Sequence, residues 1–180
     1  MPVDVKDLLY LTINEIGKEK IRTEVASNVD ACEKYCVEII SKCRRKLGSD
    51  PKDEVLATLC EALLHFMLTA SLLPSERKVK IRDIEIDVVI PSTRTLTKSP
   101  EKSLVIQIVR KNDVAAKIKQ AESVQPNNNN IWLISASPAQ VTQRNYHLGS
   151  GSFSYMRIFS DINAFLMEKG QGGLKLLHGQ

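Results

Sequence analysis

Residues 81–90 alternate between apolar and polar side chains with a period of two, which predicts a β-strand with one buried face. The apolar positions of this strand are expected to point to one side of a sheet: Ile84, Ile86, Val88 and Ile90. The acidic positions are expected to point to the other side: Asp83, Glu85 and Asp87. Pro91 lacks a backbone N–H group and therefore ends the strand. Together with the residues from 77 onward, this strand is expected to form an antiparallel hairpin.

A further strand is predicted over residues 104–111, where the side chains are almost all apolar. Such a run is typical of a strand buried on both faces of a mixed or parallel sheet. A helix over 113–122 and a strand over 131–135 follow, and the three elements predict a βαβ unit with parallel strands and a right-handed crossover. Three positions of the first strand share one face: Gln107, Val109 and Lys111.

Three helices are predicted before the hairpin. Residues 4–22 form an amphipathic pattern that is weakened at Gly17, and a second pattern runs from Ser27 or Asn28 to about Leu47. The third helix begins at Asp50-Pro51 and ends near Leu72. Its polar positions, spaced by three and four residues, stack into one stripe: Glu54, Thr58, Glu61 and His65.

The rest of the chain gives weaker patterns. Residues 92–102 are expected to form a basic loop, 138–145 a short helix and 153–159 a last strand, and a final helix should end near Lys169. The glycine-rich tail, 170–180, is expected to be frayed.

Composition adds limits to this picture. The chain has 180 residues and a net charge of +4, so it can form one sizeable core and is mildly basic, which permits a nucleic-acid partner without demanding one. No apolar run is long enough to cross a bilayer, and the start does not read as a signal peptide, so a cytoplasmic protein without a membrane partner is expected. The four cysteines lie in helical patterns and are interpreted as reduced, buried thiols rather than a metal site.

The order helix, acidic hairpin, buried strand, helix and parallel strand over residues 50–135 resembles the restriction-endonuclease-like (PD-(D/E)xK) superfamily. It is similar to archaeal Holliday-junction-resolvase-like proteins. The resemblance implies an α/β (α+β) fold, with a small central mixed sheet flanked by helices and extra N-terminal helices. The division implied is a helical extension at 1–48, a nuclease-like domain at 49–169 and a flexible tail at 170–180.

The resemblance also implies a metal site. Asp87 falls on the metal-binding aspartate of the family, Gln107 on the first position of its catalytic triplet, and Glu61, or alternatively Glu54, on a helical glutamate. The chain departs from the family at Val109, which stands where the catalytic lysine is expected. Lys111, one strand period further on, is the replacement, with Lys117 as the other choice. The implied cofactor is Mg²⁺ or Mn²⁺, although the neutral Gln107 would weaken its binding.

The chemistry that such a site supports is phosphodiester hydrolysis, in which two carboxylates hold the metal and a lysine stabilises charge on the phosphate. Basic residues near the expected site are candidates for phosphate contacts, with a solvated surface as the alternative. They are Arg94, Lys98, Lys102, Arg110, Lys117, and beside them Lys111 and Lys119.

Three hypotheses follow. The first is a nuclease-like protein that binds or hydrolyses nucleic acid, DNA rather than RNA, with impaired catalysis, so that enzyme activity is left open. The second is a non-catalytic scaffold or protein-interaction module that retains the fold. The third is an unrelated small α/β domain. By analogy with the family, a two-fold homodimer or a partner protein is expected, with the N-terminal helices as the interface.

Overall fold

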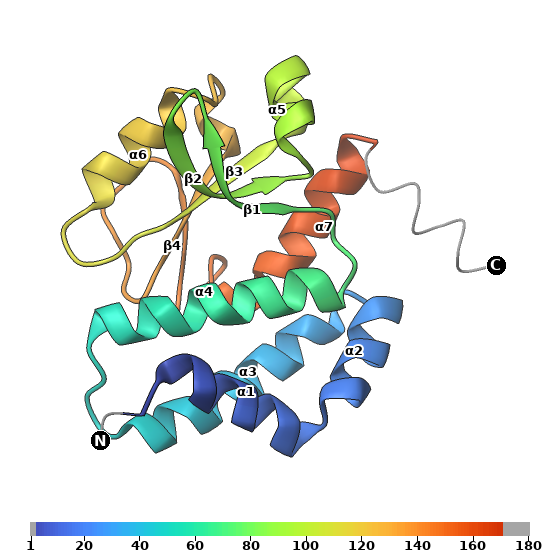
Figure 1. The fold of residues 1–180 in the computed structure, drawn as a ribbon, viewed down its shortest axis with the longest axis vertical. Helices are drawn as coiled ribbons and strands as arrows, with labels where there is room; N and C mark the ends of the chain where they lie inside the picture. The colour runs from blue at the N-terminus through green and yellow to red at the C-terminus, as the bar shows by residue number, and fades with distance from the viewer. Residues whose placement is uncertain (1–2, 171–180) are drawn as a thin grey trace.

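The centre of the structure is a mixed five-stranded sheet (Figure 1). The computed structural model describes residues 3–170. The strands lie side by side in chain order: Glu76–Ile81 (β1), Ile84–Ile90 (β2), Leu104–Ile108 (β3), Ile131–Ser135 (β4) and Arg144–His147 (β5). β1, β2 and β3 pair antiparallel, whereas β3, β4 and β5 pair parallel. The predicted parallel pairing of 104–108 with 131–135 is confirmed, and helix α6 (Val114–Glu122) connects these two strands.

Helices cover both faces of the sheet (Figure 1). One face carries α4 (Asp53–Ala70) and α7 (Ile158–Glu168), and three N-terminal helices form a further layer outside these two. These are α1 (Val5–Ile16), α2 (Lys18–Ser27) and α3 (Ala31–Leu47). The other face carries α6 and α5 (Thr93–Lys98) over a smaller core. The predicted α+β fold, a small mixed sheet flanked by helices, is confirmed.

The β1–β2 ribbon changes sides in its middle. Val88 and Ile90 pack into the large core with α4, whereas Ile84 and Ile86 pack into the small core with α6. Side chains two residues apart normally share a face, so the ribbon must bend between 86 and 88, at Asp87. The register of the two strands places Lys78 opposite Asp87, and Lys78 has the unusual φ of +48°. The expectation that the four apolar side chains of β2 share one face is therefore wrong.

Several predicted boundaries also differ. The helix predicted over 4–22 divides in two at Gly17, whose φ of +121° suits glycine and breaks the helical path. Asp83 lies in the hairpin turn rather than in a strand, because Arg82 and Asp83 both have positive φ. β3 ends at Ile108, three residues earlier than predicted. Residues 92–102 contain α5 and a 3-10 helix, and Ser92 caps α5 by accepting a hydrogen bond from the Thr95 N–H group.

The C-terminal part departs further from the sequence pattern. Residues 144–147 form the edge strand β5 instead of part of a helix, and the strand predicted over 153–159 is a 3-10 turn that leads into α7. Tyr155 is fully buried there, and its hydroxyl donates a 2.7 Å hydrogen bond to the carbonyl oxygen of Cys60. The tail from 171 onward lies outside the described residues. Within residues 3–170, no helix has the length and apolar character needed to span a membrane.

Candidate functional site

Asp87 lies where β2 stops pairing with β3. The last paired positions are Val88 and Ile106, and beyond them the Asp87 side chain fills the space between the strands. Its Oδ2 atom accepts a 2.8 Å hydrogen bond from the Ile108 N–H group and a 2.9 Å hydrogen bond from Lys117 Nζ. The two charged side chains are only 19% and 22% exposed. A single carboxylate thus joins the ribbon to the end of β3 and to α6.

Gln107 is fully buried beside Asp87 and, like Asp87, connects the ribbon, β3 and α6. Its Oε1 atom accepts a 2.8 Å hydrogen bond from the Asp87 N–H group. Its Nε2 atom donates to the carbonyl oxygen of Lys117 at 3.3 Å and to Gln120 Oε1 at 3.4 Å. The structure therefore brings Asp87 and Gln107 together, as the sequence suggested. However, the amide oxygen that would face a metal ion already has a backbone partner.

The two candidate lysines are placed differently. Because β3 ends at Ile108, Lys111 does not continue its face but lies exposed in the turn before α6. The expectation that Lys111 continues the strand on the same face as Val109 is therefore wrong. Lys117, on the first turns of α6, is the lysine that reaches Asp87. Val109, which the sequence resemblance placed where a catalytic lysine is expected, is buried in the small core.

Glu61 forms a second charged cluster, on α4. The carboxylate is buried, accepts a hydrogen bond from the Arg110 guanidinium and lies 3.3 Å from Lys78 Nζ. Arg110 also donates a 2.7 Å hydrogen bond to Thr58 Oγ1, one turn before Glu61 on the helix. These contacts tie α4 to the bend of the ribbon and to the chain after β3. Glu54, the alternative to Glu61, is exposed.

The predicted metal ligands do not converge on an open site. Asp87 is neutralised by Lys117, and Glu61 is neutralised by Arg110 and Lys78. Over residues 3–170, no group of three or more histidine, cysteine, aspartate and glutamate side chains is arranged to hold a metal ion. A hard divalent cation such as Mg²⁺ binds through one or two carboxylates and several water molecules. In this arrangement both candidate carboxylates are already balanced by cationic side chains, which opposes the binding of Mg²⁺ or Mn²⁺.

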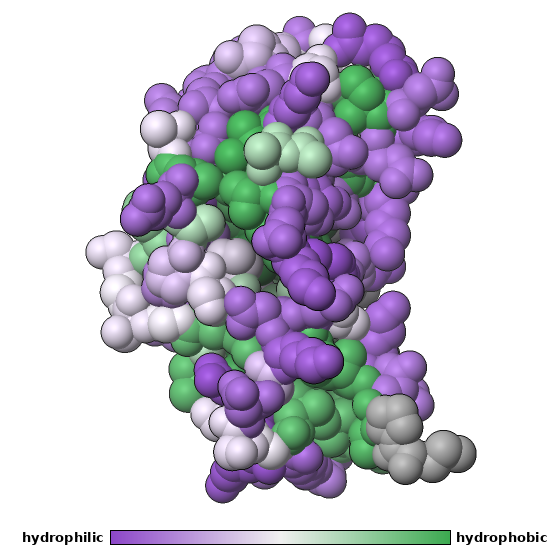
Figure 2. Space-filling model, turned by 90° about the vertical axis from the view of Figure 1, so that its left-hand side faces the viewer, coloured by the Kyte–Doolittle hydropathy of each residue, from purple (hydrophilic) through white to green (hydrophobic). Residues whose placement is uncertain are grey.

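The predicted phosphate-binding residues fall into two groups. Arg94, Lys98 and Lys102 are exposed on α5 and the 3-10 turn after it, next to the end at which β3 begins. Arg110 and Lys117 lie at the other end of β3 and are engaged with carboxylates. Hydrophilic side chains, interrupted by small hydrophobic patches, cover the upper part of the side of the molecule shown in Figure 2.

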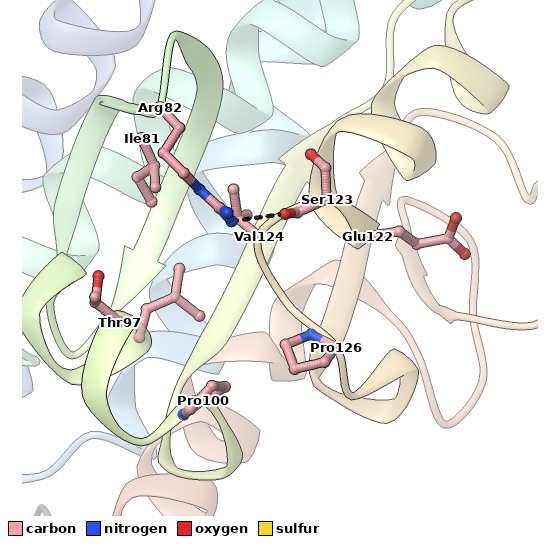
Figure 3. A pocket seen from close by; sticks show the side chains of 9 residues that line it. Ile81, Arg82, Thr97, Pro100, Glu122, Ser123, Val124 and Pro126 are labelled. Atoms are coloured by element: carbon pink, nitrogen blue, oxygen red, sulfur yellow. Dashed lines mark hydrogen bonds between the residues drawn. The ribbon is translucent and has the colours of Figure 1, made fainter.

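A hollow of about 510 Å³ lies between the turn of the β1–β2 ribbon, α5 and the C-terminal end of α6 (Figure 3). Arg82 extends across it from the turn and donates a 2.9 Å hydrogen bond to the carbonyl oxygen of Ser123. Thr97, which precedes Lys98, lines the opposite side. The hollow therefore borders the basic group on α5. Sequence reasoning missed Arg82 and Lys78, because the contact of Arg82 depends on how the hairpin turn packs against the end of α6 and that of Lys78 on the bend of the ribbon.

The bent antiparallel ribbon, the parallel β3–β4 pair joined by α6 and the carboxylate where β2 and β3 diverge define a restriction-endonuclease-like fold. A solved structure with this fold, described as metal-depleted Ecl18kI in complex with uncleaved, modified DNA, is similar to the chain with a TM-score of 0.54. The match covers 97% of this chain and 87% of that chain at 10% sequence identity, so it establishes the fold alone. No protein-family model and no curated protein sequence matches the chain.

Proposed function

We propose that the chain is a nucleic-acid-binding protein, for DNA rather than RNA, that uses a nuclease-like fold and has lost or reduced metal-dependent cleavage. The observation that carries the loss of cleavage is the Asp87 carboxylate, whose Oδ2 atom is held by Lys117 Nζ at 2.9 Å and by the Ile108 N–H group at 2.8 Å. We include in the proposal a kinship with archaeal Holliday-junction-resolvase-like proteins whose catalytic motif is degenerate in this chain.

Loss of cleavage follows from the competition for Asp87. A divalent ion would have to displace an ammonium group that already balances the carboxylate charge in a half-buried setting. Gln107 adds no charge, and Val109 offers no group that could orient or activate a water molecule. Asp87 and Glu61 remain the carboxylates to test as metal ligands, because Asp87 lies where β2 and β3 diverge and Glu61 is paired with Arg110, just after β3.

Binding to DNA is supported by charge and by the similar protein, whose solved structure is a complex with DNA. Arg94, Lys98 and Lys102 project from one short segment with Glu101 as its acidic residue. None of the three basic residues has an ion-pair partner within the part of the chain that the structure describes. Free cationic side chains clustered in this way are suited to phosphate contacts, which displace counterions from DNA.

The test measures DNA affinity by fluorescence anisotropy at several salt concentrations, with duplex and four-way-junction DNA. Replacing Arg94, Lys98 and Lys102 by glutamine should lower affinity and reduce the salt slope by roughly one for each phosphate that is no longer neutralised. The matched control replaces three exposed lysines of the helical layer, Lys6, Lys20 and Lys52, and should leave the slope unchanged. Absence of salt-dependent binding to either DNA, or to RNA, would favour the scaffold hypothesis instead.

The catalytic part of the proposal has its own test. Wild-type protein and the Asp87→Ala variant are incubated with the same DNA substrates in Mg²⁺ and in Mn²⁺. We expect neither protein to cleave and neither ion to raise the melting temperature. Cleavage by the wild type that disappears in Asp87→Ala would show an active metal-dependent nuclease and overturn the loss of catalysis, while leaving DNA binding intact.

A further inference from the structure

A small cationic pocket lies on the face of the sheet opposite α6. Its volume is about 240 Å³, and it is formed by α1, α2, α4 and β1. The polar residues that line it are Tyr10, Lys18, Arg22, His65, Thr69 and Arg77. Three of them are permanently or normally cationic, and among the described lining residues none is acidic. The pocket therefore concentrates positive charge without a carboxylate of its own.

The break at Gly17 builds one wall of this pocket. Because the chain turns there, α2 packs on α4 separately from α1 instead of continuing its path. Lys18 and Arg22 are four residues apart on α2 and therefore lie on the same side of that helix. Arg22 is paired with Glu19 at 3.2 Å, but that glutamate is 82% exposed, so the pair is weak.

His65 forms the floor. Its Nε2 atom is buried and has no hydrogen-bond partner within residues 3–170. Burial first, and then the charge of Arg77, lower the pKa of His65 to about 4. A buried polar nitrogen without a partner is unfavourable by itself, and such groups are rare in folded proteins. An anion in the pocket would balance the surrounding cations, and a small rotation of the imidazole would give this nitrogen the missing partner.

We propose that this pocket binds a phosphate group, held by His65, Arg77 and the two basic residues of α2. Arg77 is suited to this role because it is exposed on β1 and has no ion-pair partner within the described part of the chain. The phosphate can belong to a free inorganic or nucleotide phosphate, or to the end of a nucleic-acid strand. The pocket is separate from the Asp87 cluster, so the proposal does not depend on DNA binding by α5.

The test titrates the protein with inorganic phosphate and pyrophosphate, against chloride at equal ionic strength, and follows the melting temperature and the imidazole NMR signals of His65. We expect the His65 signals to shift and the melting temperature to rise. The charged groups that act on His65 are Arg77, Lys78, Glu61 and Asp87. Lys18 and Arg22 line the facing wall of the pocket. Bound phosphate should raise the pKa of His65 from its low value.

Two variants make the result specific. Arg77→Gln should weaken phosphate binding by roughly tenfold or more, because it removes a charge-assisted hydrogen bond. Lys80→Gln removes the same charge from the same strand, but Lys80 does not line the pocket, so binding should persist. Circular dichroism checks that both variants are folded.

A second arm distinguishes the source of the phosphate. Oligonucleotides with a 5′-phosphate and with a 5′-hydroxyl are compared by the same His65 signals. A response to the phosphorylated strand that is lost in Arg77→Gln assigns the pocket to a strand end, whereas a response to inorganic phosphate alone assigns it to a small molecule. If no phosphate compound moves the His65 signals, or if Arg77→Gln and Lys80→Gln behave alike, the proposal is wrong.

Discussion

At the scale of single residues, Asp87 has a structural task that its position alone would not reveal. Its carboxylate accepts hydrogen bonds from the end of β3 and from Lys117, while its own N–H group bonds to Gln107. These bonds hold the strands together where their regular pairing ends. The carboxylate that the sequence suggested as a metal ligand thus has a role in stabilising the fold.

Replacing Asp87 by alanine should therefore lower the free energy of unfolding by about 1–2 kcal/mol, since a half-buried charged acceptor is removed and Lys117 loses its partner. Urea denaturation measures the change. Glu85→Ala is the matched control, because Glu85 lies two residues earlier on the same strand and is exposed. Equal stability of the two variants would contradict the structural role of Asp87.

His65 predicts a dependence of stability on pH. Its pKa is about 4 in the folded protein, lowered mainly by burial, against about 6.5 for an exposed histidine. Between these values the unfolded chain binds more protons, so this stabilising contribution is complete above pH 6.5 and is lost as the pH falls toward 4. Urea midpoints in phosphate-free buffers should fall less steeply on acidification for His65→Gln than for the wild type. If the urea midpoints of the two proteins fell equally with pH, His65 would not contribute to the pH dependence of stability.

At the scale of elements, α4 is fixed to the sheet by charge as well as by apolar packing. Glu61 accepts from Arg110, which follows β3, and lies 3.3 Å from Lys78 at the bend of β1. The sequence stripe suggested a solvated or ligand-bearing face for this helix. Instead, its central carboxylate is covered by the sheet and paired within the chain.

The variant Glu61→Gln should lower the free energy of unfolding by about 1–3 kcal/mol, because Arg110 would lose its ionic partner in a half-buried setting. Glu54→Gln, two turns earlier on the exposed part of the same stripe, should change it by less than about 0.5 kcal/mol. Chemical denaturation of both variants checks the difference. A neutral effect of Glu61→Gln would mean that the three charges are held apart by solvent.

Strong periodicity makes some elements predictable, and weak periodicity misleads for others. β2, β3, α6 and β4 follow patterns of alternation, continuous apolar residues and helical spacing that tertiary contacts do not override. The aromatic run from Phe153 favours a strand, yet Tyr155, Phe159, Ile162 and Leu166 are buried at the spacing of a helix. β5 escapes prediction because its four residues are mostly polar and rely on pairing with β4.

The candidate site was likewise predictable only in part. Asp87 and Gln107 could be placed together because neighbouring strands fix their distance. The choice between Lys111 and Lys117 could not be made, since it depends on where β3 ends and on the direction in which α6 leaves it. The change of sides within β2 was also hidden, because a bend at one pair of residues leaves the alternation of the sequence intact.

At the scale of the whole molecule, one continuous core joins the N-terminal helices to the sheet. Buried side chains of α1, α2 and α3 belong to the same cluster as Val88, Ile106 and Trp132. A boundary near residue 48 therefore remains a prediction from the sequence. Many apolar side chains of these helices are used within the chain, whereas Tyr10, Leu11 and Val37 stay exposed on them, so the expected homodimer through these helices likewise remains a prediction.

This shared core predicts a single cooperative unfolding transition. Trp132 is the chain's one tryptophan and is 2% exposed on β4, so its fluorescence reports on the sheet, while far-ultraviolet circular dichroism reports mainly on the helices. The two signals should give the same urea midpoint, as expected for two-state behaviour. Separate midpoints would show that the helical layer unfolds independently of the sheet.

The bend at Lys78 and Asp87 has a consequence for how the sequence can change. The half of the ribbon with Val88 and Ile90 packs into the large core, whereas the half next to the hairpin turn, with Ile84 and Ile86, packs into the small core. A shift of the β1–β2 pairing by one residue would move the side chains of both halves to the opposite face of the ribbon. Each of the two cores therefore restricts the register of these strands, and the two cores share no side chain. Exchanges of one aliphatic residue for another can accumulate there, whereas the gain or loss of a single residue cannot.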